Sequence, residues 1–257
     1  LEARRFLLVG SDYVFPHAAN AIIRDHVAAK GGEVVGEAYV PLGERNVSEL
    51  IELVLNTRPD IILNSINGDT NIDFFRELRA ADIGSDQIPT ISFSIGESEL
   101  RGMSAAHVSG DYAAWNYFQS IPGKTNLTFV RQFGDRYHPR RVLSDPMQSA
   151  WNAVHLWAEA ANQAQSLETA RVREQLPSIT FAAPEGEVRV DPDNQHLWMH
   201  ARIGKITPAR FFDVVWESDR PRRPEPFPAT RTPEQWQEFL DQLYVGWGNR
   251  WSRANAP

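Results

Sequence analysis

The sequence predicts an α/β fold in which the first half of the chain forms a doubly wound parallel sheet. Short apolar segments alternate there with segments of helical length, beginning with residues 6–9 and 16–30. The spacing between consecutive predicted strands accommodates one helix, as right-handed crossovers require. The chain has 257 residues, 42% of them hydrophobic, which is enough for one large domain or two modest ones.

The predicted elements follow one another along the first 120 residues. Pro16 suits the first turn of a helix, where its missing N–H costs nothing, and Gly31-Gly32 ends that helix. Helices are predicted over 16–30, 47–56 and 72–81, and strands over 6–9, 33–40, 60–66, 89–94 and 108–115.

The pattern changes after Ile121-Pro122-Gly123, where longer helices and then a β-meander are predicted. The helices cover 125–138, 145–165 and 166–176, and the strands cover 181–190, 197–206 and 211–217. A proline-rich arm at 220–228 precedes a last helix over 232–251. These pieces do not form an obvious second domain by themselves, so we expect them to complete another part of the fold.

Composition excludes several classes of function. The net charge is −7 with scattered Lys and Arg, which is unlike the clustered basic face of a nucleic-acid-binding protein. The absence of cysteine rules out disulfides, thiol catalysis and thiolate metal sites. The sequence contains no phosphate-binding glycine loop, no nucleophile elbow and no Ser/His/Asp order typical of a triad. These absences weigh against an enzyme, and we expect no cofactor or metal site.

Polar and aromatic loops follow three of the predicted strands, over residues 11–15, 64–71 and 92–97. The carboxyl ends of parallel strands lie side by side and line one crevice. Acceptor oxygens beside an aromatic wall suit a small, neutral ligand rich in N–H donors, such as an amide or urea. The candidate ligand-binding residues are Asp12, Tyr13, Phe15, Asn67, Asp69 and Ser94.

Structural interpretations of the same residues remain open. The run from Asn67 to Asn71 also fits a turn followed by helix capping, an interpretation as good as ligand binding for Asp69 and better for Asn71. Tyr13 and Phe15 fit packing between domains equally well.

Several motifs resemble the urea- and short-chain-amide-binding proteins of the type I periplasmic-binding-protein superfamily. They are GSDYVFPHAAN, NSINGDTN, SFSIGESE, GDYAAWNYFQSI, FAAPEGEVRVDPDNQHLW and RPEPFP, and they span nearly the whole chain. Tyr13 matches the first tyrosine of the amide sensors' GSDYxYP motif, while Phe15 replaces the second. The NGDTN loop and the YAAWNYFQSI run look more like the urea-receptor branch.

The resemblance implies a hinged receptor of two lobes that closes on urea or a short-chain amide and performs no catalysis. It implies an ABC permease or a regulatory protein as partner, a periplasmic location, and membrane association only through a permease. Residues 1–120 would form lobe two, 121–180 helices returning to lobe one, 181–218 a β-meander leading back to lobe two, and 219–257 the arm and last helix. The first half of lobe one, which family members carry before the GSDY strand, is expected to be missing.

Two alternative functions stay open. One is a cytoplasmic amide-sensing module that regulates gene expression through a partner protein. The other is a branched-chain amino-acid receptor of the same superfamily, whose ammonium and carboxylate partners would come from the missing half. A hydrolase-like or flavodoxin-like enzyme is disfavoured by the absent motifs.

Overall fold

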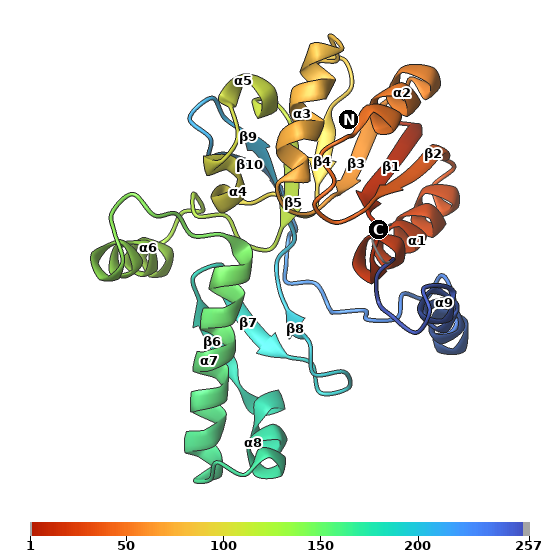
Figure 1. The fold of residues 1–257 in the computed structure, drawn as a ribbon. Helices are drawn as coiled ribbons and strands as arrows, with labels where there is room; N and C mark the ends of the chain where they lie inside the picture. The colour runs from red at the N-terminus through yellow and green to blue at the C-terminus, as the bar shows by residue number, and fades with distance from the viewer. Residues whose placement is uncertain (1, 254–257) are drawn as a thin grey trace.

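The structure is a computed structural model that describes residues 2–253. Its main body is a seven-stranded sheet with the order β10-β9-β5-β4-β3-β1-β2 (Figure 1). Strands β1 to β5 pair in parallel, whereas β9 is antiparallel to both β5 and β10. The strands are β1 (Arg5–Ser11), β2 (Glu33–Val40), β3 (Ile61–Ser65), β4 (Thr90–Ser92), β5 (Tyr112–Trp115), β9 (Arg202–Ile206) and β10 (Phe212–Glu217). The predicted α/β class with a mostly parallel sheet is confirmed.

Helices cover both faces of this sheet, which explains the apolar run from Phe6 to Val9 in β1. Leu7 and Val9 belong to the core formed with α2 (Ser48–Thr57) and α3 (Thr70–Ala80). Leu8 points the other way, into a smaller core with Ile23 of α1 (Val14–Ala29). Successive side chains of a strand alternate between faces, so burial on both faces needs an unbroken apolar run.

The strand predicted over 108–115 is shorter than expected. Its beginning belongs instead to the short helix α5 (Ala105–Val108), and a turn with Gly110 at φ +92° separates this helix from β5. Asp111 in that turn is fully buried, pairs with Arg79 and accepts a hydrogen bond from the Thr90 amide at 2.8 Å. A helix, α4 (Glu97–Arg101), also begins after the loop that follows β4.

A second, smaller body lies below the main sheet in Figure 1. A small core containing Leu156, Val172, Ile179 and Val190 joins its helices to a three-stranded antiparallel sheet of order β6-β7-β8. Its elements are α7 (Asp145–Ala164), α8 (Thr169–Gln175), the 3-10 turn η1 (Leu176–Ser178), β6 (Thr180–Ala183), β7 (Gly186–Val190) and β8 (Leu197–Trp198). The helix α6 (Lys124–Arg136) precedes them in the chain and packs Phe129 into the main core.

The predicted meander is divided between the two sheets, so the expectation of continuous strands over 181–190 and 197–206 is wrong. The first is a hairpin, because Pro184-Glu185 turns the chain and Gly186 adopts φ +121°. The second stops at Trp198, leaves the small sheet, and resumes as β9 in the main sheet. No glycine or proline marks the break at residues 199–201, so the sequence does not reveal the change of sheet.

The arm leads to the last helix, α9 (Pro233–Gly246), which is shorter than the predicted 232–251. Thr232 caps its start, and Gly248 at φ +67° follows its end. The helix packs on α1, where Arg231 pairs with Asp25 at 2.8 Å. Within residues 2–253, no helix combines the length and apolar character needed to cross a bilayer.

The close approach of β9 to the core predicts the effect of one substitution. A Cβ at the buried Gly204 would lie 2.8 Å from the Phe118 ring and 2.9 Å from Cβ of Phe212. We expect Gly204→Ala to lower the free energy of unfolding by about 1–3 kcal/mol, because the packed core must shift. Gly246→Ala is the control, since a Cβ there meets nothing within 4 Å. Urea denaturation of both variants tests this, and equal stabilities would contradict it.

Candidate functional site

The loops after β1, β3 and β4 lie next to one another at one edge of the main sheet. Gly10 pairs with Ser65, and Asn64 pairs with Ser92, so all three strands end at the same level. The expectation that these loops are neighbours is therefore confirmed by the strand pairing. Whether they bind a ligand remains a prediction.

Buried side chains connect the three loops by hydrogen bonds. Ser11 Oγ accepts the backbone N–H of Asn67 at 2.9 Å. Asn64 Nδ2 donates to Asn71 Oδ1 at 2.9 Å and to Ser92 Oγ at 3.0 Å. Because all these partners except Asn67 are buried, the bonds act in a medium where an unmade bond is costly, and they hold the loops in one conformation.

Asn71 does not cap the following helix, contrary to the interpretation favoured from sequence. Asp69 is the N-cap residue of α3, and its side chain makes no capping hydrogen bond. The Asn71 amide instead donates to the Ile66 carbonyl at 2.6 Å, so Asn71 fixes the loop from inside. Asp69 itself is exposed at the loop surface.

The other predicted residues differ in how many of their side-chain atoms are available to a ligand. Ser94 donates its hydroxyl to the Ile66 carbonyl, and Asn67 Nδ2 donates to the Ser65 carbonyl at 2.9 Å. Both side chains keep oxygen lone pairs that can accept further bonds. Tyr13 and Phe15 lie with ring centroids 6.3 Å apart, Tyr13 half-buried and Phe15 42% exposed.

Asp12 is already paired on both carboxylate oxygens. His17 Nε2 lies 2.9 Å from Oδ1, and Arg253 Nε lies 3.1 Å from Oδ2. The segment at 251–253 runs along this loop, because the Val14 amide donates to the Trp251 carbonyl at 2.9 Å and Tyr13 forms a bridge with Ser252. Asp12 therefore holds this loop and the segment at 251–253 together, and its carboxylate is not a free acceptor at this edge.

Sequence reasoning missed two residues beside Asp12. The His17 ring stacks on Tyr39 of β2 with centroids 3.6 Å apart, and Trp247 meets its edge at 5.0 Å. Burial lowers the pKa of His17, against the opposing effect of its hydrogen bond to Asp12, and burial raises the pKa of Tyr39 to about 12. The sequence indicates this pair only through its five-residue spacing. That spacing allows Asp12, in the loop before α1, to reach His17 in the first turns of the helix.

A buried arginine joins the two bodies where the chain crosses between them. The Arg202 guanidinium donates to the carbonyl of Asn116 after β5, to the carbonyl of Glu185 between β6 and β7 at 2.7 Å, and to Glu217 of β10 at 2.7 Å. The carboxylate of Asp145, at the start of α7, accepts the amide of Asn116 at 3.1 Å. Segments from both bodies thus meet at one cation.

Carboxyl groups with raised pKa values surround this crossing. Burial raises the pKa of Glu97 to about 7, with the Asp145 charge adding to it, although the amide of Gln119 donates to Glu97 at 2.6 Å. Burial likewise raises the pKa of Glu185 to about 7, although Asn152 Nδ2 donates to it at 2.6 Å. Glu97 is 1% exposed, although it lies at the start of the short helix α4.

These pKa values predict a pH dependence of stability. Folding raises both values above that of an unfolded glutamate, so the native state holds protons that the unfolded chain releases. The stabilisation is complete below about pH 4.5 and declines as pH rises through about 7. Glu97→Gln keeps an acceptor for Gln119 and cannot ionise, so it should lose less stability between pH 5 and 8.

Thermal unfolding at several pH values measures this difference. The variant is expected to exceed the parent at pH 8 by up to about 3 kcal/mol. Exposed Glu52→Gln on α2 is the matched control, expected to follow the parent. A Glu97→Gln curve parallel to that of the parent would refute the assignment.

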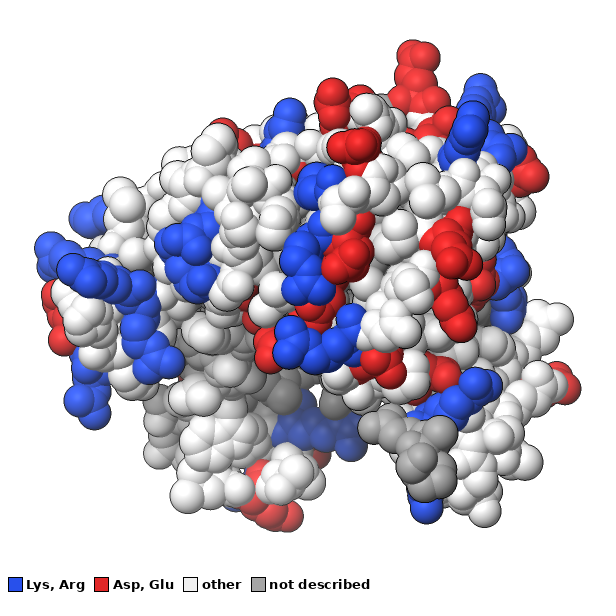
Figure 2. All heavy atoms as spheres, turned by 45° about the horizontal axis from the view of Figure 1, so that its top comes forward, with Lys and Arg blue, Asp and Glu red and all other residues white. Residues whose placement is uncertain are grey.

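The six predicted residues border an open edge. Four pockets in the described part of the chain, of about 470–900 Å³, are lined by other residues. The surface in Figure 2 carries positive and negative side chains interspersed, in keeping with the mixed charge of the sequence. No group of His, Asp and Glu among residues 2–253 has the arrangement of a metal site.

Comparison with solved structures identifies the fold. An amino-acid ABC transporter substrate-binding protein from Pseudomonas fluorescens Pf-5 has a TM-score of 0.77 and 17% identity, over 87% of this chain and 61% of that one. A solute-binding protein from Rhodopseudomonas palustris BisB5, in complex with 3,4-dihydroxybenzoic acid, has a TM-score of 0.76 and 18% identity, over 86% of this chain and 62% of that one. A branched-chain amino-acid ABC transporter ligand-binding protein from Burkholderia xenovorans LB400 has a TM-score of 0.72 and 17% identity, over 83% of this chain and 58% of that one.

The chain therefore spans about three-fifths of the length of these relatives, and it shares with them the type I periplasmic-binding-protein fold. The family model described as "Periplasmic binding protein domain" matches residues 1–233. That family consists of binding proteins rather than enzymes. The chain belongs to the periplasmic binding protein domain family.

Proposed function

We propose that the chain is part of a solute receptor for urea or a short-chain amide, with the loop edge after β1, β3 and β4 as one wall of the ligand site. The observation that carries the proposal is the chemistry of this edge. Asn67, Asp69 and Ser94 bring acceptor oxygens there, and Tyr13 and Phe15 add aromatic surface. Asp12 acts as a positioning residue, since its oxygens are already paired.

The charge of the edge favours a neutral ligand over a carboxylate. The three loops, residues 11–15, 64–71 and 92–97, contain Asp12, Asp69 and Glu97 but no lysine or arginine. A ligand carboxylate at this wall would meet the exposed Asp69, since Asp12 is paired with Arg253 and Glu97 is buried, whereas the N–H groups of urea or an amide would meet acceptors. This distinguishes the proposed ligand from the acids named for the relatives.

The crossing at Arg202 supports a closing motion. Short segments, among them residues 116–123 and 199–201, are the connections between the two bodies. Rotation about such connections would bring the second body over the loop edge, and ligand binding would favour the closed form. We propose an ABC permease in the periplasm as the partner that recognises it, because the solved relatives are described as ABC transporter proteins.

An amino-acid receptor is the second candidate, because two of the structural relatives are described as proteins for amino acids. Its ligand would need a cation for the carboxylate. The three loops contain no lysine or arginine, and Arg253 beside them is already paired with Asp12, so the opposite wall would have to supply the cation.

Calorimetry with urea, acetamide, leucine and benzoate tests the proposal on this chain and on the full-length product of its gene. We expect heat with urea or acetamide only. Asp69→Ala should weaken that binding about tenfold, because a ligand N–H loses a charged acceptor. Asn162→Ala, exposed on α7 and away from the loops, is the control. Binding of leucine alone would favour the second candidate, and no response to urea or any amide would reject the ligand class.

A further inference from the structure

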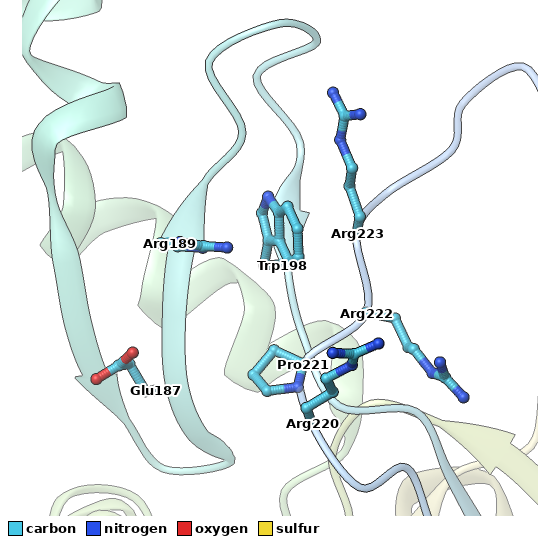
Figure 3. Close-up of a pocket in the computed structure, with 7 residues that line it drawn as sticks. All are labelled: Glu187, Arg189, Trp198, Arg220, Pro221, Arg222 and Arg223. Carbon is cyan, nitrogen blue, oxygen red and sulfur yellow. The ribbon is translucent and has the colours of Figure 1, made fainter.

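A pocket of about 540 Å³ lies between the small sheet and the proline-rich arm, outside the loop edge (Figure 3). Its volume falls in the range of small-molecule sites. The lining residues come from β7, β8 and the arm: Glu187, Arg189, Trp198, Arg220, Pro221, Arg222 and Arg223. Four of these seven are arginines, although the chain as a whole carries a net charge of −7.

Two of the four guanidinium groups are held in place by other side chains. Arg223 pairs with Asp191 at 3.0 Å and also with Asp193. The Arg189 guanidinium lies over the Trp198 ring, 4.1 Å from its centroid. Such contacts fix the groups at the pocket wall before any ligand arrives.

The remaining two guanidinium groups carry uncompensated charge. Arg220 and Arg222 are exposed, and neither side chain has an ion-pair or hydrogen-bond partner among the described residues. Figure 3 shows both on the same stretch of the arm as Pro221. Guanidinium groups that are weakly hydrated and free to form two parallel bonds are suited to carboxylates.

The arm that presents these arginines is anchored to the small body. Met199 and Arg222 exchange backbone hydrogen bonds of 2.7 and 3.4 Å, and Asn194 Nδ2 donates to the Pro224 carbonyl at 3.1 Å. The Trp198 Nε1 donates to Asp191 at 2.9 Å, which fixes the indole ring. The backbone of the arm and the indole ring are thus fixed, while the Arg220 and Arg222 side chains stay free to turn toward a ligand.

We propose that this pocket is a second binding site, which takes a planar aromatic carboxylate. The ligand ring would lie against Trp198 and Pro221, and its carboxylate would pair with Arg220 and Arg222. Glu187, the one acidic residue of the lining, disfavours highly charged anions such as phosphate. The site shares no residue with the proposed urea site, so either can exist without the other.

Calorimetry with 2-naphthoate, 2-naphthamide and inorganic phosphate separates the contributions of ring and charge. We expect binding of 2-naphthoate alone, weakened roughly tenfold or more by Arg220→Gln or Arg222→Gln, since each removes a charge-assisted bond. Arg131→Gln, on the exposed face of α6, is the matched control and should leave the affinity unchanged. Saturating urea should not displace the naphthoate.

Each other outcome overturns the proposal. If 2-naphthamide binds as tightly as 2-naphthoate, the arginines do not recognise the carboxylate. If phosphate binds as tightly, the aromatic ring does not contribute to binding. Naphthoate that fails to bind, or that binds equally well to both arginine variants, leaves no site in this pocket. If Asp69→Ala weakens the binding of naphthoate, the ligand binds at the loop edge rather than in this pocket. Circular dichroism of each variant checks folding, which these exposed arginines are not expected to affect.

Discussion

The Arg202 guanidinium is the interaction on which the arrangement of the two bodies depends. It is 4% exposed, and it joins the end of β5, the turn of the β6-β7 hairpin and the end of β10. Its Nε has no partner among the described residues, so the bonds of the two terminal nitrogens compensate the buried cation, and removal of one of those partners would be costly. The crossing therefore has one favoured geometry, and any closing motion must pivot around these bonds or exchange them.

Three buried carboxyl groups lie around the same crossing. Glu97, Asp145 and Glu185 all have raised pKa values for the same first cause, loss of water around the carboxyl. Their partners are mainly amides, of the backbone and of asparagine and glutamine side chains, rather than cations. Several of these hydrogen bonds also join residues at the crossing, such as that of the Tyr117 amide to Asp145.

Local chemistry in the sequence was sufficient to predict the parallel part of the fold. The apolar run ending at Val9 and the loop that begins at Ser11 gave the first strand and its edge, because burial on both faces leaves a clear signal. The change of sheet between Trp198 and Arg202 left no such signal, because strands of two different sheets alternate alike. At the candidate site, the topology of a parallel sheet was enough to predict that the three loops are neighbours. The ion pair of Asp12 with Arg253 joins residues far apart in the chain, so local sequence could not predict it.

The two outer strands of the main sheet carry devices that discourage self-association. β2 leaves one side unpaired and bears Glu33 and Glu37, while β10 bears Asp213 and Glu217 and is interrupted by a bulge between Val214 and Trp216. Charges and bulges on edge strands prevent a second chain from adding to the ladder of hydrogen bonds. The exposed Val215 and Trp216 would otherwise make β10 a template for aggregation, so substitutions that flatten this edge carry a risk for expression that no change in the ligand site would share.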